Sequence, residues 1–288
     1  MYNIIMNKLS LERKVRVIKA LVDGNSIRAT CRITNTAKGT VIRLLRDVGK
    51  ACAEYQDKYL RNLPCKRIQC DEIWSFCYAK QKNVPEAKQG QLGYGDVWTW
   101  TAIDADTKLV PSWLVGLRDA SYGYRFMADL KSRLANRVQL TTDGHGVYLW
   151  AVEDAFGSEV DYAMLVKLYG QEPESERRYS LAQCIAANPT IIQGHPDPAK
   201  ISTSFVERQN LTMRMSMRRF TRLTNGFSKK IENLEYAVAL HFMYYNFARS
   251  HKTLTNPYPK TPAMAAGISN HVWTVEEIVK LTDDYAGL

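Results

Sequence analysis

Three acidic residues of this sequence stand where a carboxylate could do chemistry. Asp71 lies inside a run rich in aromatic and β-branched residues, 66–78, and Asp143 ends a similar run further along the chain. Glu207 is the single acid of an otherwise basic stretch, 204–220. An unpaired Asp in an apolar strand costs roughly several kcal/mol, which a divalent metal would remove. Three converging carboxylates can hold two Mg²⁺ ions roughly 3.5–4 Å apart, an arrangement that promotes phosphodiester chemistry.

Each of these acids also has a purely structural explanation. Asp71 could pair with Arg67 or Lys66. The second acid could be a turn residue, and the third could be a surface acid in a salt bridge. Glu72, the neighbour of Asp71, would point to the opposite face of its strand and is expected to be structural. The sequence alone leaves these alternatives open.

Apolar periodicity predicts the elements that would position the acids. Strands are predicted at 66–78, 97–104, 109–116 and 138–144, and helices at 122–136, 147–156 and 228–249. This order predicts a mixed α/β sheet, in which ligands bind at the carboxyl ends of central strands. Residues 157–203 hold several Pro and Gly residues and are predicted to be an insertion or long loop. A helix over 204–220 would carry Glu207 and Arg214 two turns apart on one face.

The N-terminal part is predicted to contain three short helices. They span 10–22, 27–33 and 37–48, with Ser10 and Ser26 as N-caps of the first two. A short turn before a basic third helix is typical of a helix-turn-helix, although an ordinary three-helix bundle is the alternative. In a helix-turn-helix, Lys38, Thr40 and Arg43 would enter the DNA groove. Residues 51–64 are predicted to be a helical linker.

The charge is unevenly distributed along the chain. The protein has 288 residues and a net charge of +10. Residues 10–50 carry ten Lys and Arg against three acids, and residues 200–230 carry eight against one. Residues 71–170 are mildly acidic, with ten bases and thirteen acids. Two basic blocks around an acidic centre indicate two contacts with a polyanion, by charge alone either nucleic acid or an anionic membrane surface.

Cysteine spacing and hydropathy bear on the compartment. The six Cys residues include no Cys-x-x-Cys pair, which argues against zinc and for free thiols in a reducing compartment. No run of 18 apolar residues exists, and the N-terminus is too short and polar for a secretory signal. A cytoplasmic protein without membrane contact is therefore expected.

Three segments carry a resemblance to a known family. Asp71 in Cys-Asp-Glu-Ile-Trp-Ser-Phe, Asp143 in Thr-Thr-Asp-Gly-His, and Glu207 in Val-Glu-Arg-Gln-Asn-Leu-Thr-Met-Arg resemble the catalytic segments of the DDE transposases. The similarity is strongest to the insertion-sequence-one family of bacterial insertion elements. Those enzymes commonly carry a base seven residues after the Glu, and Arg214 stands there in this chain. The resemblance covers about residues 65–266.

The resemblance implies a ribonuclease-H-like catalytic domain that uses Mg²⁺ or Mn²⁺, two per site, to cut element ends and join their 3′-hydroxyls to target DNA. Asp71, Asp143 and Glu207 would be the catalytic residues and metal ligands. DNA contacts are expected from a set of polar and basic residues: Lys38, Thr40, Arg43, Arg208, Asn210, Arg214, Arg218 and Arg219. The partners would be the terminal inverted repeats and target DNA, bound by a homodimer or larger assembly.

The resemblance also divides the chain into three domains. A helix-turn-helix domain with its linker would span 1–60, the catalytic domain 61–225 with the insertion 157–203, and a helical C-terminal extension 226–288. Two features depart from the family, because a zinc-binding N-terminal segment is lacking and Asp143 lies far from Glu207 in sequence. The alternative function is a catalytically inactive or domesticated DDE-fold regulator that binds DNA.

Overall fold

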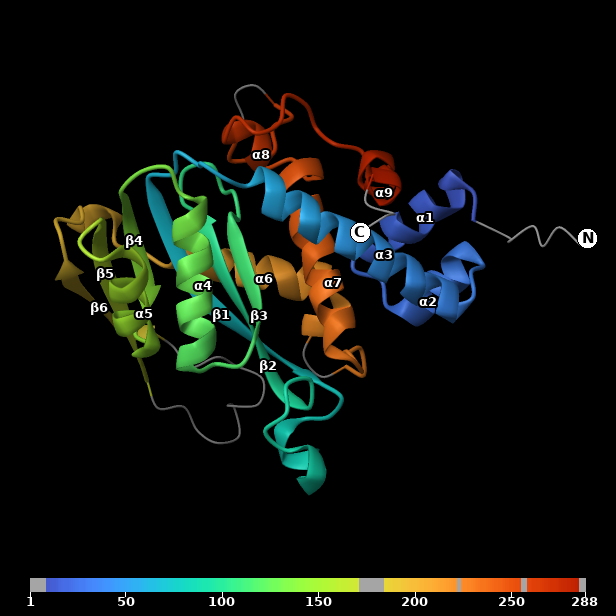
Figure 1. The fold of residues 1–288 in the computed structure, drawn as a ribbon, viewed down its shortest axis with the longest axis horizontal. Coiled ribbons are helices and arrows are strands. Elements are labelled where there is room, and N and C mark those ends of the chain that lie inside the picture. The colour runs from blue at the N-terminus through green and yellow to red at the C-terminus, as the bar shows by residue number, and fades with distance from the viewer. Residues whose placement is uncertain (1–8, 171–183, 222–223, 255–257, 285–288) are drawn as a thin grey trace, which may run out of the picture. The chain divides into compact units, whose positions relative to one another are not determined.

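The computed structural model describes residues 9–170, 184–221, 224–254 and 258–284 (Figure 1). Within these limits the chain forms two compact units. The sheet unit comprises Leu60–Ile73 and Trp98–Asn210. The helical unit comprises Met1–Tyr59, Trp74–Val97 and Leu211–Leu288. Both units are therefore discontinuous in sequence, and the division into three domains stays a prediction.

The sheet unit contains most of a six-stranded mixed sheet. The strands, in the spatial order β3-β2-β1-β4-β5-β6, are β1 (Arg67–Cys77), β2 (Gly95–Asp104), β3 (Ser112–Gly116), β4 (Val138–Asp143), β5 (Val160–Tyr169) and β6 (Cys184–Gln193). β4 is parallel to both β1 and β5, whereas the pairs β2–β3 and β5–β6 are antiparallel. The predicted fold class, a mixed α/β sheet, is confirmed, and its ribonuclease-H-like character stays a prediction.

Two helices lie side by side on one face of this sheet, α4 (Ala120–Arg133) and α5 (Val147–Phe156) (Figure 1). Asp119 caps α4 by accepting a hydrogen bond from the backbone N–H of Tyr122 at 3.1 Å. Fully buried Trp100 of β2 packs between the helices, with ring centroids 5.9 Å from Phe126 and 5.6 Å from Tyr148. Burial of these large rings against the sheet is a main apolar contribution to the unit.

The prediction that 157–203 is an insertion or long loop is wrong for the described part of that segment. β5 pairs in parallel with β4 over Val160–Leu165, and β6 pairs with β5. Tyr162, Ala163 and Met164 are buried one after another, so this part of the strand is apolar without alternation. That pattern hides the strand from a search for alternating polarity. Residues 171–183 lie outside the described residues.

The helical unit begins with the three predicted helices, α1 (Leu11–Val22), α2 (Ile27–Thr34) and α3 (Lys38–Tyr59). The predicted caps are confirmed, since Ser10 accepts from the N–H of Arg13 at 3.4 Å and Ser26 from that of Ala29 at 3.1 Å. Asn35 takes a left-handed conformation, φ 48°, in the turn between α2 and α3. α3 is longer than predicted and continues through most of the expected linker.

The remaining helices follow the sheet strands in sequence. They are α6 (Ser204–Ser216), α7 (Ile231–Met243) with the π-helical turn η5 (Tyr244–Ala248), α8 (Pro262–Ala265) and α9 (Val275–Asp284). Short 3₁₀ turns are η1 (Gln81–Asn83), η2 (Glu86–Lys88), η3 (Pro198–Lys200) and η4 (Arg218–Phe220). α7 packs along α3, and α9 packs on α1 and α3. Within the described ranges, no helix has the length and apolar character needed to cross a membrane.

Candidate active site

The carboxylates of Asp71 and Asp143 are brought together by the pairing of β1 with β4. These strands are parallel neighbours, and Cys70 is in register with Thr142. The next residue on each strand is the acid, so the two side chains stand next to each other, with Asp143 at the C-terminal end of β4 and Asp71 midway along β1. The sequence predicted that ligands would bind at the carboxyl ends of the central strands, and Asp143 stands at such an end.

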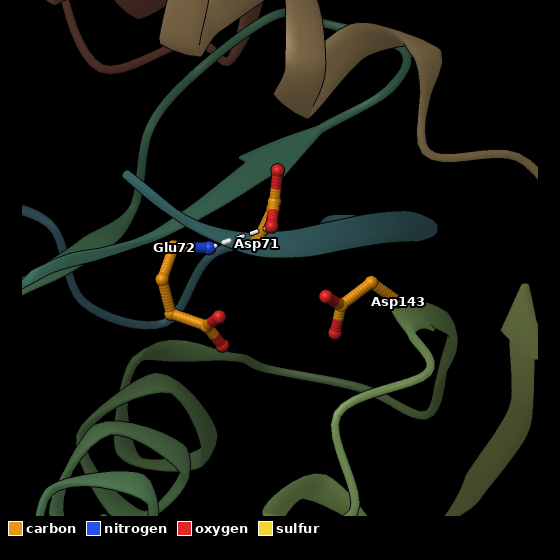
Figure 2. A group of neighbouring side chains, drawn as sticks. All are labelled: Asp71, Glu72 and Asp143. Carbon is orange, nitrogen blue, oxygen red and sulfur yellow. Dashed lines mark hydrogen bonds between the residues drawn. The ribbon is translucent and has the colours of Figure 1, made fainter. Parts of the chain in front are cut away.

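A third carboxylate, Glu72, joins them. Asp71 and Glu72 leave β1 on opposite sides, and the carboxylate of Glu72 faces that of Asp143 (Figure 2). Asp71, Glu72 and Asp143 each offer an oxygen atom that lies within 4.8 Å of the other two. Glu72 was expected to be only structural, but its side chain is long enough to reach Asp143 from the other face of the strand.

Hydrogen bonds fix the orientation of the two aspartates. Asp71 Oδ1 accepts from the backbone N–H of Glu72, and Oδ2 accepts from Asn210 Nδ2, each at 2.8 Å. Asp143 Oδ1 accepts from the backbone N–H of His145 at 3.0 Å. Asp71 therefore does not depend on Arg67, which instead donates to Asp106 at 3.1 Å. The structural explanation of Asp71 as an ion-pair partner of Arg67 does not hold.

Arg118 supplies a cation to this group. Its Nε donates to Glu72 Oε2 at 3.1 Å, and its Nη2 lies 3.7 Å from Asp143 Oδ2. The guanidinium also lies 5.0 Å from the ring of Trp98, which holds it in place. The other oxygen of Glu72, Oε1, is buried and has no hydrogen-bond partner within 3.5 Å. One guanidinium therefore contacts two of the three carboxylates, Glu72 and Asp143.

The pKa values report this excess of negative charge. Burial, followed by the charges of Asp143 and Glu72, raises the pKa of Asp71 to about 8. Burial and Asp143 raise the pKa of Glu72 to about 7, against the opposing effects of Tyr148 and Arg118. Carboxylates with raised pKa values are stabilised in their charged form by an additional cation. The donor set consists of hard oxygens, the ligands that Mg²⁺ and Mn²⁺ prefer, so the residues present fit a divalent metal.

Glu207 lies on α6 and is held by two other groups. Thr203 Oγ1 donates to Glu207 Oε1 at 2.5 Å, and Lys167 Nζ of β5 forms an ion pair with the same oxygen. Among the described residues, the group with oxygens within 4.8 Å of one another does not include Glu207. Its charge nevertheless acts on Asp71 and raises the pKa of that carboxyl. The role of Glu207 as a metal ligand stays a prediction, and the ion pair with Lys167 gives it a structural role as well.

The residues predicted to contact DNA differ in accessibility. The side chains of Lys38, Arg43, Arg208 and Arg218 are exposed, and those of Thr40, Arg214 and Arg219 are half-buried. Arg219 Nη1 donates to Ser228 Oγ at 2.6 Å, and burial lowers the pKa of Arg219 to about 10. Asn210 is buried, and its amide donates to Asp71. Its place is therefore beside the carboxylates, while the DNA contacts of the set stay predictions.

Three residues of the site were not selected from the sequence: Glu72, Arg118 and Lys167. Glu72 was excluded by strand alternation, which ignores side-chain length. Arg118 follows a strand by two residues and carries no motif of its own. Lys167 lies on β5, a strand that the sequence analysis assigned to a loop. The apolar run that begins at Val160 was the available signal for that strand.

Comparisons with known proteins identify no close relative. No protein-family model matches the chain, and no curated protein matches it in sequence. A cryo-EM structure of a piggyBac transposase synaptic complex with hairpin DNA is similar at 10% identity and a TM-score of 0.43, covering 100% of this chain and 75% of that one. A Mos1 mariner paired end complex with Mn has 11% identity, a TM-score of 0.21, and coverage of 56% and 60%. The Mos1 strand transfer complex has 11% identity, a TM-score of 0.24, and coverage of 84% and 78%. Likenesses at this level assign no function.

Removing the Arg118 cation is expected to strengthen metal binding. In Arg118→Gln, Mn²⁺ no longer competes with a guanidinium for Glu72 and Asp143, and we expect its affinity to rise about fivefold or more. The metal-free protein should melt at a lower temperature, because buried Glu72 loses its ionic partner. Isothermal titration with Mn²⁺ and thermal melting in EDTA measure the two effects.

Arg137→Gln is the matched control for Arg118→Gln. Arg137 lies in the same unit and pairs with Asp161 at 2.7 Å, outside the carboxylate group. Its loss should lower the melting temperature without changing Mn²⁺ affinity. Unchanged or weaker Mn²⁺ binding by Arg118→Gln would show that Arg118 does not compete with a metal.

Proposed function

We propose that the chain is a DDE-type DNA transposase. It would cleave the ends of an insertion element and join their 3′-hydroxyls to target DNA by metal-dependent phosphodiester chemistry. One observation carries the proposal: Asp71 and Asp143, from neighbouring parallel strands of a ribonuclease-H-like sheet, converge with Glu72 within 4.8 Å. The segments that resemble the DDE family supply the type of reaction and the bacterial insertion-sequence context.

The chain's own residues would hold and shape the reactive centre. Asp71 and Asp143 would bind Mg²⁺ or Mn²⁺, with Glu207 from α6 completing the set. A bound pair of these ions activates a water or 3′-hydroxyl and neutralises charge on the leaving oxygen. Asn210 would keep Asp71 oriented through its 2.8 Å hydrogen bond. Lys167 would hold the Glu207 carboxylate in place before a metal binds.

DNA is the expected substrate because the two basic blocks of the sequence, 10–50 and 200–230, expose basic side chains. Lys38 and Arg43 are exposed on α3, and Arg218 is exposed on η4. Such groups gain affinity by displacing counterions from phosphates. We propose that the terminal inverted repeats bind these surfaces and that two or more copies act on paired ends.

The test is a cleavage and joining reaction. The full chain would be incubated with Mg²⁺, labelled duplexes carrying the terminal repeats that flank its coding region, and a target plasmid. Cleavage at the 3′ ends together with labelled plasmid supports the proposal. Nicking without joining would indicate a nuclease instead, and intact DNA would favour the inactive DNA-binding regulator.

Arg214→Ala is expected to weaken DNA binding and to flatten its salt dependence. A side chain that contacts one phosphate adds about one unit to the slope of log K against log salt, so its removal should lower the slope by about one. Anisotropy titrations of a labelled duplex at several salt concentrations measure this. Lysine at the same position keeps the charge and should keep the slope. An unchanged slope with a lowered melting temperature would make Arg214 a structural residue of α6.

A further inference from the structure

The helical unit contains a row of aromatic side chains along the end of β1. Trp74 and Phe76 lie two residues apart, so they share one face of the strand. Their ring centroids are 5.8 Å apart, and the ring of Phe76 lies 4.6 Å from that of Phe227. All three rings are only half-buried. The row therefore presents aromatic surface to solvent and is not a closed apolar core.

Lysine ammonium groups lie over the rings of this region. Lys229 Nζ is 3.6 Å from the centroid of Phe227. A separate pair of rings, Tyr78 and Tyr94, has centroids 5.1 Å apart, and Lys88 Nζ is 4.6 Å from both. Tyr78 is 37% exposed. Aromatic faces beside cations are the arrangement on which unpaired bases stack while their phosphates are neutralised.

A basic cavity of about 1190 Å³ shares residues with this row. Phe227 and Lys229 belong to its lining, together with basic side chains of α2, α3, η4 and the segment before α7: Arg28, Lys38, Arg46, Arg218 and Lys230. Glu232 is the acid among the described lining residues. The cavity could accept several phosphates, and its boundary residue Phe227 is the last ring of the aromatic row.

We propose that Trp74, Phe76 and Phe227, with Lys229, form a binding site for unpaired nucleotides of single-stranded DNA. Bases would stack on the aromatic surface that these half-buried rings leave exposed, and the sugar-phosphate backbone would follow Lys229 and Lys230 into the basic cavity. The choice of DNA over RNA rests on the proposed transposase function. The binding of unpaired nucleotides does not rest on that function, because the site lies within the helical unit and uses none of the three carboxylates.

Two ring-to-aliphatic substitutions test the stacking. Phe76→Leu and Phe227→Leu keep apolar bulk but remove the π face, and each is expected to weaken binding of a labelled oligothymidylate about tenfold. Affinity for a duplex of equal length should change less than twofold, since paired bases do not offer their faces. Phe227→Tyr retains the ring and should bind like the wild type.

Further variants separate stacking from folding and from charge. Trp74→Leu should weaken oligothymidylate binding, whereas Tyr124→Leu, which alters an exposed tyrosine of the sheet unit, should not. Lys229→Gln should weaken single-strand and duplex binding alike and lower the salt slope. Thermal melting of every variant reports folding.

The site is refuted if the well-folded leucine variants bind oligothymidylate as tightly as the wild type does, or if the wild type does not prefer it to duplex. Tighter binding of oligouridylate than of oligothymidylate would overturn DNA as the occupant. These measurements need neither Mg²⁺ nor cleavage. The single-strand site can therefore be refuted while the transposase proposal stands, and the transposase proposal can be refuted while the single-strand site stands.

Discussion

Asp71→Asn is expected to abolish metal-dependent cleavage and joining of DNA while the chain stays folded. Asp71 belongs to the carboxylate group and accepts hydrogen bonds from the Glu72 N–H and from Asn210. An amide keeps the shape and one acceptor but cannot supply a negative oxygen to a metal. We expect the rate to fall roughly 10³-fold or more, the scale seen when a main charge-stabilising group is lost.

A second readout of Asp71→Asn does not depend on activity. Mg²⁺ or Mn²⁺ should raise the melting temperature of the wild type, because a ligand that binds the native state stabilises it. This shift should be largely lost in Asp71→Asn. Without metal the variant should melt no lower than the wild type, since burial and neighbouring charges disfavour a carboxylate at this position.

Asp154→Asn is the control for Asp71→Asn, because it makes the same chemical change on the exposed surface of α5. It should cleave DNA and respond to metal as the wild type does. If Asp71→Asn cleaved DNA at nearly the rate of this control, both the metal site and the proposed role of Asp71 in the chemistry would be refuted.

Gly49→Ala is expected to destabilise the helical unit more than any other single methyl addition on α3. A Cβ at residue 49 would lie 2.5 Å from both the Cβ and the backbone oxygen of Tyr236 on α7. Neither atom can be moved by rotating a side chain, so the two helices would have to separate. Across the same interface, Gln56 Nε2 donates to the backbone oxygen of Ala239 at 3.0 Å. We expect a loss of about 3 kcal/mol in the free energy of unfolding.

Gly39→Ala provides the matched control on the same helix. A Cβ at this position has no neighbouring atom within 4 Å. Alanine favours the helix over glycine, so this variant should be more stable by about 0.5–1 kcal/mol. Urea unfolding followed by circular dichroism compares the two. Equal stability of the two alanine variants would mean that α3 and α7 do not pack closely at Gly49.

Local features of the fold were predictable because they depend on neighbours in sequence. Ser10 and Ser26 were identified as caps from their position before apolar-periodic runs, and both accept the expected backbone hydrogen bonds. The hairpin of β2 and β3 followed from two β-rich runs and a short turn. β5 was missed because Tyr162, Ala163 and Met164 are buried one after another, without the alternation that marks a strand.

The candidate site divides in the same way. From the sequence came the two aspartates, since an acid in an apolar strand and an acid at a strand end are unusual enough to require a partner. Only the tertiary structure placed them side by side, through the register of β1 and β4. It also added Glu72 and Arg118 to the group, and it paired Glu207 with Lys167.

The physical reason is that the sequence determines residue types and local periodicity, whereas the distance between two side chains depends on strand register and side-chain length. Carboxylates at positions 71 and 143 fix the chemistry that is available, namely hard oxygen ligands for a divalent cation. The charge balance that makes a cation necessary arises only when burial and packing set three carboxylates against one guanidinium. For this protein the sequence thus determined which atoms could react, and the fold decided which of them meet.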